Sequence, residues 1–142
     1  MSPGLREEFQ RWARGVPPVM RQDALWRLSA YRFARFASAR AWAHTTVLVR
    51  DPRMWRVSRQ LYGALGSICA NLAEGHSRSS PADRARFYEY ALGSSRESRE
   101  WYFHGAPILG DAETTVAIEL LDEITALNAA YVSDQRQRAG RK

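Results

Sequence analysis

The sequence has little that marks a secreted or membrane-bound protein. Its 142 residues include one cysteine, Cys69, so no disulfide can form within the chain and a reducing compartment is the expected setting. No apolar run approaches the roughly 18 residues of a membrane span, and the first residues do not resemble a secretion signal. We therefore expect a soluble, cytoplasmic protein of about one domain, with no membrane partner.

Residues that carry catalysis or hold metals are also sparse. The three histidines, His44, His76 and His104, fall on separate expected elements, and only Glu100 and His104 have the spacing of a ligand pair on one helix. The repeated Glu-x-x-His of a di-iron bundle, a Gly-rich phosphate loop and a G-x-S-x-G elbow are missing from the sequence. We expect a protein that is not an enzyme and that has no metal and no cofactor.

Lysine is nearly absent, and the positive charge is concentrated in one half of the chain. Lys142 is the one lysine among 21 cationic side chains. Residues 1–60 hold twelve arginines against four acidic residues, whereas the remaining residues hold nine cations against eleven carboxylates. Because the planar guanidinium suits bidentate contact with phosphate and stacking on bases, a polyanion is the first partner to consider.

The pattern of apolar residues predicts an all-α fold. No segment alternates apolar and polar residues for long, whereas several segments repeat apolar residues with a helical period. Asp51-Pro52 and Ser80-Pro81 are start signals, Asp23 is a candidate N-cap, and Gly75 is a candidate C-terminal cap. Four long helices are expected, at about residues 23–46, 51–75, 80–105 and 111–133, after a short amphipathic helix at about residues 5–14.

Short connections between long amphipathic helices predict an antiparallel up-and-down four-helix bundle. We divide the chain into an Arg-rich N-terminal arm at residues 1–22, the bundle domain at residues 23–133, and a basic C-terminal tail at residues 134–142. The third long helix is expected to end near residues 105–107, where Gly105-Ala106-Pro107 interrupts the pattern.

Small and polar residues share faces of the second and third long helices. Gly63, Gly66, Ala70, Gly93 and Ser98 indicate a face packed closely against another helix. Polar side chains on such a face have to satisfy one another, so we interpret them as a network that fixes helix or subunit register. The alternative is a metal or acid–base site at the two carboxylates. The network residues are Asn71, Glu74, Arg78, Ser94 and Glu97.

Arginines recur every three residues around the start of the second long helix, beside Trp55, and are expected to form a slowly drifting stripe on it. A solvated helix face is the competing interpretation, and the arginines of the first long helix suit solubility equally well. Nothing in the set specifies a base, so binding is expected to be sequence-nonspecific and to weaken with salt. The predicted nucleic-acid-binding residues are Arg50, Arg53, Arg56, Arg59, Arg32 and Arg35.

Over residues 23–131 the chain resembles the four-helix bundle proteins encoded in ribosomal RNA intervening sequences. That family is similar in fold to the accessory proteins of diversity-generating retroelements, which assist a reverse transcriptase. The resemblance implies a bundle that assembles into a ring, typically a homopentamer, with a basic surface for nucleic acid and no established catalysis. The matching residues are Gln60-Leu61, Ala64, Ser67-Ile68, Asn71 to Gly75, Arg78, Phe87, Ala91, Gly93-Ser94 and Glu97.

The chain departs from this resemblance in two places. Tyr62-Gly63 stand where relatives usually carry basic residues, so the contact with nucleic acid has moved or been lost. The Arg-rich extension before residue 21 lies outside the family core and is a lid, an arm for RNA, or disorder.

Two functions follow from the sequence. The first is a non-enzymatic, ring-forming bundle that binds RNA or DNA through its Arg-rich helices, as a scaffold for a partner enzyme such as a reverse transcriptase. The second is a protein-interaction module whose basic half docks the acidic fourth helix of a neighbour or another acidic protein, with no nucleic acid.

Overall fold

The computed structural model describes residues 1–141, and these residues form helices and turns with no strand. The prediction of an all-α fold is confirmed. The elements are α1 (Pro3–Gly15), α2 (Pro18–Gln22), the 3-10 turn η1 (Ala24–Arg27), α3 (Ser29–Leu48), the 3-10 turn η2 (Pro52–Met54), α4 (Trp55–His76), α5 (Pro81–Leu109) and α6 (Asp111–Ala139).

The start signals act as expected, although two of them cap short turns. The Asp51 carboxylate accepts a hydrogen bond from the Arg53 amide at 3.0 Å, and the Ser80 hydroxyl accepts one from the Asp83 amide at 3.4 Å. Asp51 caps η2 and Asp23 caps η1, and the long helices α4 and α3 begin a few residues later. Capping is local chemistry, so the sequence locates the signal better than the length of the first turn.

The helix predicted to end at Gly75 ends one residue later, at His76, with Ser77 rather than Gly75 as its cap, and the helix predicted to end near residues 105–107 continues to Leu109. A Cβ atom at Gly75 would lie 2.8 Å from the Tyr88 ring, so this glycine lets α5 approach α4 rather than ending the helix. Helix α5 continues through Pro107 to Leu109 and is capped by Gly110, whose φ of 83° favours glycine. Ile108 and Leu109, packed against the core, hold this last turn in place.

Helix α6 also continues past its expected end at residue 133. Gln135 is buried, and Arg136 forms an ion pair with Glu89 of α5. These contacts hold the last turns of α6, up to Ala139, against α5.

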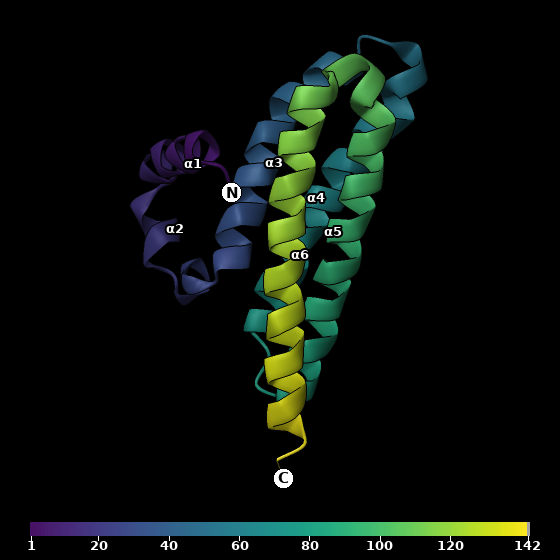
Figure 1. Ribbon diagram of the computed structural model, residues 1–142. Helices are drawn as coiled ribbons and strands as arrows, with labels where there is room; N and C mark the ends of the chain where they lie inside the picture. The colour runs from purple at the N-terminus through teal and green to yellow at the C-terminus, as the bar shows by residue number, and fades with distance from the viewer. Residues whose placement is uncertain (142) are drawn as a thin grey trace.

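Helices α3 to α6 lie side by side around one core, as Figure 1 shows. Helix α3 packs against α4 and α6, and α5 packs against the same two helices. Phe36, Leu65, Tyr102 and Leu121, one from each helix, are exposed by at most 1%. Burial of each such side chain stabilises the fold by roughly 1.5–3 kcal/mol.

The N-terminal helix α1 lies against the side of α3 (Figure 1). The Phe9 ring contacts the Phe33 and Phe36 rings edge-on, with ring centroids 5.0 and 5.5 Å apart. Leu5 is 5% exposed in the same core. Of the three interpretations of this extension, disorder therefore does not describe residues 3–27.

Among the described residues, no helix has the length and apolar character that a bilayer crossing requires.

Candidate functional site

The six arginines predicted to bind nucleic acid occupy separate parts of the fold. Arg50 follows α3, Arg53 lies in η2, and only Arg56 and Arg59 lie on α4. The regular stripe on one helix is therefore wrong, because the Asp51 cap produces a 3-10 turn before α4 begins. We call Arg50, Arg53, Arg56, Arg59 and the adjoining Trp55 the turn cluster.

Arg53 is exposed, but its charge is matched locally. Its Nε and Nη2 atoms donate to the Asp51 carboxylate at 3.0 and 2.6 Å. The hydrogen bonds from the Arg53 side chain and amide lower the pKa of Asp51 to about 2. Arg53 and Asp51 thus contribute no net charge to this surface at neutral pH.

Arg50, Arg56 and Arg59 are exposed and form no ion pair within residues 1–141. Trp55 beside them is 61% exposed, and its indole nitrogen donates to the Val49 carbonyl at 2.9 Å. Trp55, Arg56 and Arg59 border a surface hollow of about 690 Å³. A fixed, open aromatic ring beside unpaired guanidiniums can stack on a base while the cations contact phosphates.

The two arginines of α3 that were predicted to bind nucleic acid, Arg32 and Arg35, are separated from Arg50 and Arg53 by the length of the helix. Arg32 is half-buried and donates to the Ser29 hydroxyl at 3.1 Å, near the start of the helix. Sixteen residues of helix, about 24 Å, separate Arg32 from Leu48 at the end of α3. Arg35 is exposed and lines a different groove, between the N-terminal segment and α3 and α4.

Part of the predicted polar network exists between α4 and α5. The Asn71 side-chain amide donates to the Ser67 carbonyl at 2.9 Å and to the Ser67 hydroxyl at 3.1 Å. The Ser94 hydroxyl of α5 donates to the Ser67 hydroxyl at 3.0 Å. This cluster ties the two helices together in one register.

The other predicted network residues stay outside this cluster. Glu74 forms an exposed ion pair with Arg78 one turn later, and Glu97 accepts a hydrogen bond from the Trp101 indole at 3.1 Å. Glu74 is therefore paired with the residue two positions beyond the end of α4 and Glu97 with a residue of α5, so the two carboxylates do not converge on one site. Residues 1–141 hold no group of three His, Cys, Asp or Glu side chains placed to share a metal ion.

Within a single chain, the glycines of this face are not packed. A Cβ atom at Gly63, Gly66 or Gly93 would meet nothing within 4 Å. Of the two forms of close packing that the sequence allows, between helices of one chain or between subunits, the first does not occur at these three glycines. A strip of small side chains on α4 and α5 is left open at the surface.

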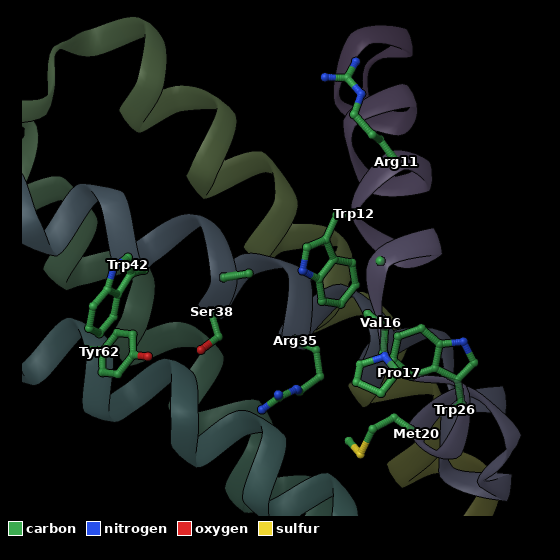
Figure 2. A pocket seen from close by; sticks show the side chains of 12 residues that line it. Arg11, Trp12, Val16, Pro17, Met20, Trp26, Arg35, Ser38, Trp42 and Tyr62 are labelled. Atoms are coloured by element: carbon green, nitrogen blue, oxygen red, sulfur yellow. The ribbon is translucent and has the colours of Figure 1, made fainter.

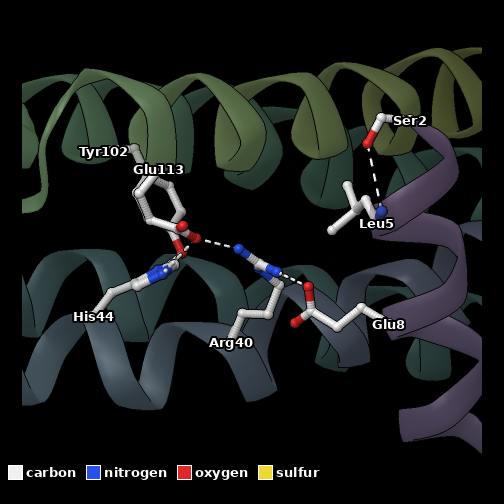
Figure 3. A network of polar contacts seen from close by, with 7 residues as sticks. All are labelled: Ser2, Leu5, Glu8, Arg40, His44, Tyr102 and Glu113. Atoms are coloured by element: carbon white, nitrogen blue, oxygen red, sulfur yellow. Dashed lines mark hydrogen bonds and ion pairs between the residues drawn. The ribbon is translucent and has the colours of Figure 1, made fainter.

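A second polar site, which the sequence analysis did not find, joins four helices (Figure 3). The Arg40 guanidinium of α3 is 13% exposed and pairs with Glu8 of α1 and Glu113 of α6. Glu113 also lies 3.1 Å from Nε2 of His44, whose Nδ1 lies 2.9 Å from the Tyr102 hydroxyl. We call these five residues the interior network.

The interior network favours a neutral imidazole. Burial lowers the pKa of His44, and the neighbouring Glu113 carboxylate opposes that shift only in part. Burial also raises the pKa of Tyr102, which keeps its hydroxyl as a donor to Nδ1. Nε2–H is then the donor to Glu113. Because Glu8, Arg40 and Glu113 are far apart in the chain, no local pattern signals the contact.

Residues 27–130 match the family described as 23S rRNA-intervening sequence protein. The chain belongs to this family. The resemblance seen in the sequence is thereby confirmed at the level of the intervening sequence family. The match covers α3 to α5 and most of α6, and leaves α1 and α2 outside. No curated protein and no solved structure matches this intervening sequence protein.

Proposed function

We propose that this chain is a non-enzymatic nucleic-acid-binding protein, in which α3 to α6 form an antiparallel up-and-down four-helix bundle. The observation that carries the proposal is the turn cluster, where Arg56 and Arg59 have no acidic partner and flank the open Trp55 ring. The family description links the chain to an intervening sequence of 23S rRNA, which makes RNA the first ligand to test.

Charge pairing favours nucleic acid over an acidic protein surface as the partner of the turn cluster. The alternative requires the carboxylates of α6 in a neighbouring copy to be available. Four of the six carboxylates of α6 are already paired within the same chain, Glu113, Asp122, Glu123 and Asp134, so only Asp111 and Glu119 are exposed without an ion pair in residues 1–141. A phosphate backbone supplies charge without breaking those pairs, and release of its counterions adds to the affinity.

Charge reversal at the turn cluster tests this function. Arg53→Glu, Arg56→Glu and Arg59→Glu together should abolish retention of a 20-base-pair RNA duplex at low salt, measured by fluorescence anisotropy. The control carries Arg86→Glu, Arg138→Glu and Arg141→Glu, which change the net charge equally at exposed positions elsewhere. Retention by the turn-cluster variant equal to that of the control would overturn the proposal.

We further propose that the protein assembles into a homo-oligomeric ring, with five subunits as the expected number, and acts in the cytoplasm as a scaffold for an enzyme such as a reverse transcriptase. The open strip at Gly63, Gly66 and Gly93 supports this assembly, because small side chains let two helices approach closely. Gly66→Leu should then reduce the mass measured by light scattering to that of a monomer. An unchanged mass would exclude this strip as the subunit contact.

A further inference from the structure

A groove of about 680 Å³ separates the N-terminal segment from the long helices. Trp12 and Trp26 stand on one side of it and Trp42 and Tyr62 on the other, as Figure 2 shows. The side carrying Trp12 and Trp26 comes from residues before position 27, where the family match begins. The groove is therefore built by the extension of this chain together with α3 and α4.

Two aromatic pairs occupy the two sides of the groove. Trp12 and Trp26 have ring centroids 6.0 Å apart and an interplanar angle of 32°. Trp42 and Tyr62 have centroids 6.0 Å apart at 64°, and these two side chains are 68% and 41% exposed. Trp12 and Trp26 are partly buried against the core and wall one side of the groove, whereas Trp42 and Tyr62 on the other side offer open faces on which a flat ligand can stack.

Charge in the groove has one sign. Arg11 and Arg35 line it, no Asp or Glu does, and neither arginine has an ion pair within residues 1–141. Figure 2 shows the Arg35 side chain between the two aromatic pairs, with Ser38 beside it. The groove thus combines stacking surfaces with cations that have no acidic partner within residues 1–141.

We propose that this groove binds a short unpaired segment of a nucleic-acid strand, with bases stacked on the Trp42 and Tyr62 rings and phosphates held by Arg35 inside the groove and by Arg11 at its rim. A cationic ligand would be repelled by the two guanidiniums, and an apolar peptide would leave them without a counter-charge. A single strand has both a flat face and a negative charge at every nucleotide. The inference rests on the proposed function, because it names which form of nucleic acid the protein takes.

The spacing of the groove residues fits a strand of a few nucleotides. Arg35, Ser38 and Trp42 follow one another at three and four residues on α3 and so share a face. The seven residues from Arg35 to Trp42 span about 10 Å along the helix axis. A stacked strand advances by about 3.4 Å per nucleotide, which gives room for about three.

The groove adjoins the turn cluster. Tyr62 lies three residues after Arg59 on α4, so the two side chains are neighbours on one helix face. A strand that leaves the groove beside Tyr62 therefore meets an unpaired guanidinium within one helical turn. The two sites share no lining residue, but Tyr62 and Arg59 place the edge of the groove one helical turn from the turn cluster.

The test compares binding of an unstructured 10-nucleotide RNA and the 20-base-pair RNA duplex by fluorescence anisotropy, using the full chain. Trp42→Ala with Tyr62→Ala should weaken binding of the single strand at least tenfold and change duplex binding less than twofold. Arg35→Gln should also weaken the single strand selectively. Phe103→Ala is the control, because Phe103 is 69% exposed and does not line the groove.

The outcomes separate this inference from the proposed function. If wild-type protein binds neither RNA, both fail together. If it binds the duplex through the turn cluster but the Trp42–Tyr62 double variant holds the single strand as tightly as wild type, the groove proposal alone is overturned. Circular dichroism should show the double variant to be folded, since neither side chain belongs to the buried core.

Three further arms identify the occupant. A single-stranded DNA of the same sequence shows whether the groove prefers RNA or DNA. Selective loss of binding to either strand in the Trp42–Tyr62 double variant supports the proposal. Uridine monophosphate bound as tightly as the strand would overturn it in favour of a nucleotide site. A double variant that changes subunit number in light scattering, with unchanged single-strand affinity, would overturn it in favour of a contact between copies.

Discussion

The interior network and the turn cluster use the same side chain for opposite purposes. Arg40 is 13% exposed and lies between the carboxylates of Glu8 and Glu113, which belong to two other helices. Arg56 and Arg59 are exposed and have no carboxylate partner within the described chain. One arginine therefore holds elements together, and the other two are available to a ligand.

This difference shows that net charge overstates the basic surface of the protein. Residues 1–60 contain twelve arginines, but Arg40 and Arg53 are neutralised by neighbouring carboxylates. Attraction for a polyanion depends on the cations that lack such partners. The four predictions below test the contrast, beginning with the largest effect.

Removal of the interior arginine should cost stability and leave nucleic-acid binding unchanged. Arg40→Met keeps most of the side-chain volume but leaves Glu8 and Glu113 without their cation. We expect the free energy of unfolding to fall by about 2–3 kcal/mol, measured by urea denaturation. A loss of RNA affinity together with the loss of stability would contradict a purely structural role for Arg40.

Removal of the turn-cluster arginines should do the reverse. Arg56→Met with Arg59→Met should weaken RNA binding about tenfold or more and lower the salt dependence by roughly two units on a log–log plot. Stability should stay within about 0.5 kcal/mol, as for other exposed substitutions. An unchanged salt slope would mean that these side chains do not reach phosphates.

Acid should weaken the interior network before it affects the turn cluster. Burial lowers the pKa of His44 in the folded state, so the unfolded chain takes up this proton first as pH falls. The contribution of His44 is complete above its ordinary pKa of about 6.5 and is lost below it. The urea midpoint should be lower at pH 5.5 than at pH 7.5, and His44→Gln should reduce that difference. An equal difference in the variant would assign it to other groups.

The smallest effect is expected from the anchoring of Trp55. Trp55→Phe keeps an aromatic face but loses the hydrogen bond to the Val49 carbonyl. RNA affinity should drop less than threefold, which corresponds to about 0.6 kcal/mol. Trp55→Ala should cost about 1 kcal/mol or more, because it removes the stacking surface. Equal losses of RNA affinity in the two variants would mean that an aromatic face at position 55 helps binding only when the hydrogen bond to Val49 holds it in place.

The sequence predicts best those features that depend on neighbouring residues. Asp51-Pro52 and Ser80-Pro81 mark helix starts because the cap, the proline and the first amides lie within four residues. The all-α class follows in the same way from the apolar period. The helix ends are harder to predict, because they depend on contacts between helices. The glycine at position 75 is required by the close approach of the Tyr88 ring, and the last turn of α5 is held by packing of Ile108 against the core.

Most of the site depends on contacts between distant residues. The pairing of Arg40 with Glu8 and Glu113 requires three helices to be in place, and no spacing in the chain encodes it. The spacing of the arginines is enough to predict the residues of the turn cluster, but it does not predict the 3-10 turn that places Arg53 before α4. The groove beside Trp12 depends on where α1 docks, and that position follows from packing of Phe9 on α3.

Cys69 makes the chain well suited to distance measurements. It is 7% exposed, and burial raises its pKa to about 11, so its thiolate is scarce at neutral pH. A cysteine introduced at the exposed Ser77 would therefore react with maleimide dyes or spin labels far faster than the native thiol. One probe per chain would then report separations between subunits, and from these the symmetry of any assembly, without removal of the natural cysteine.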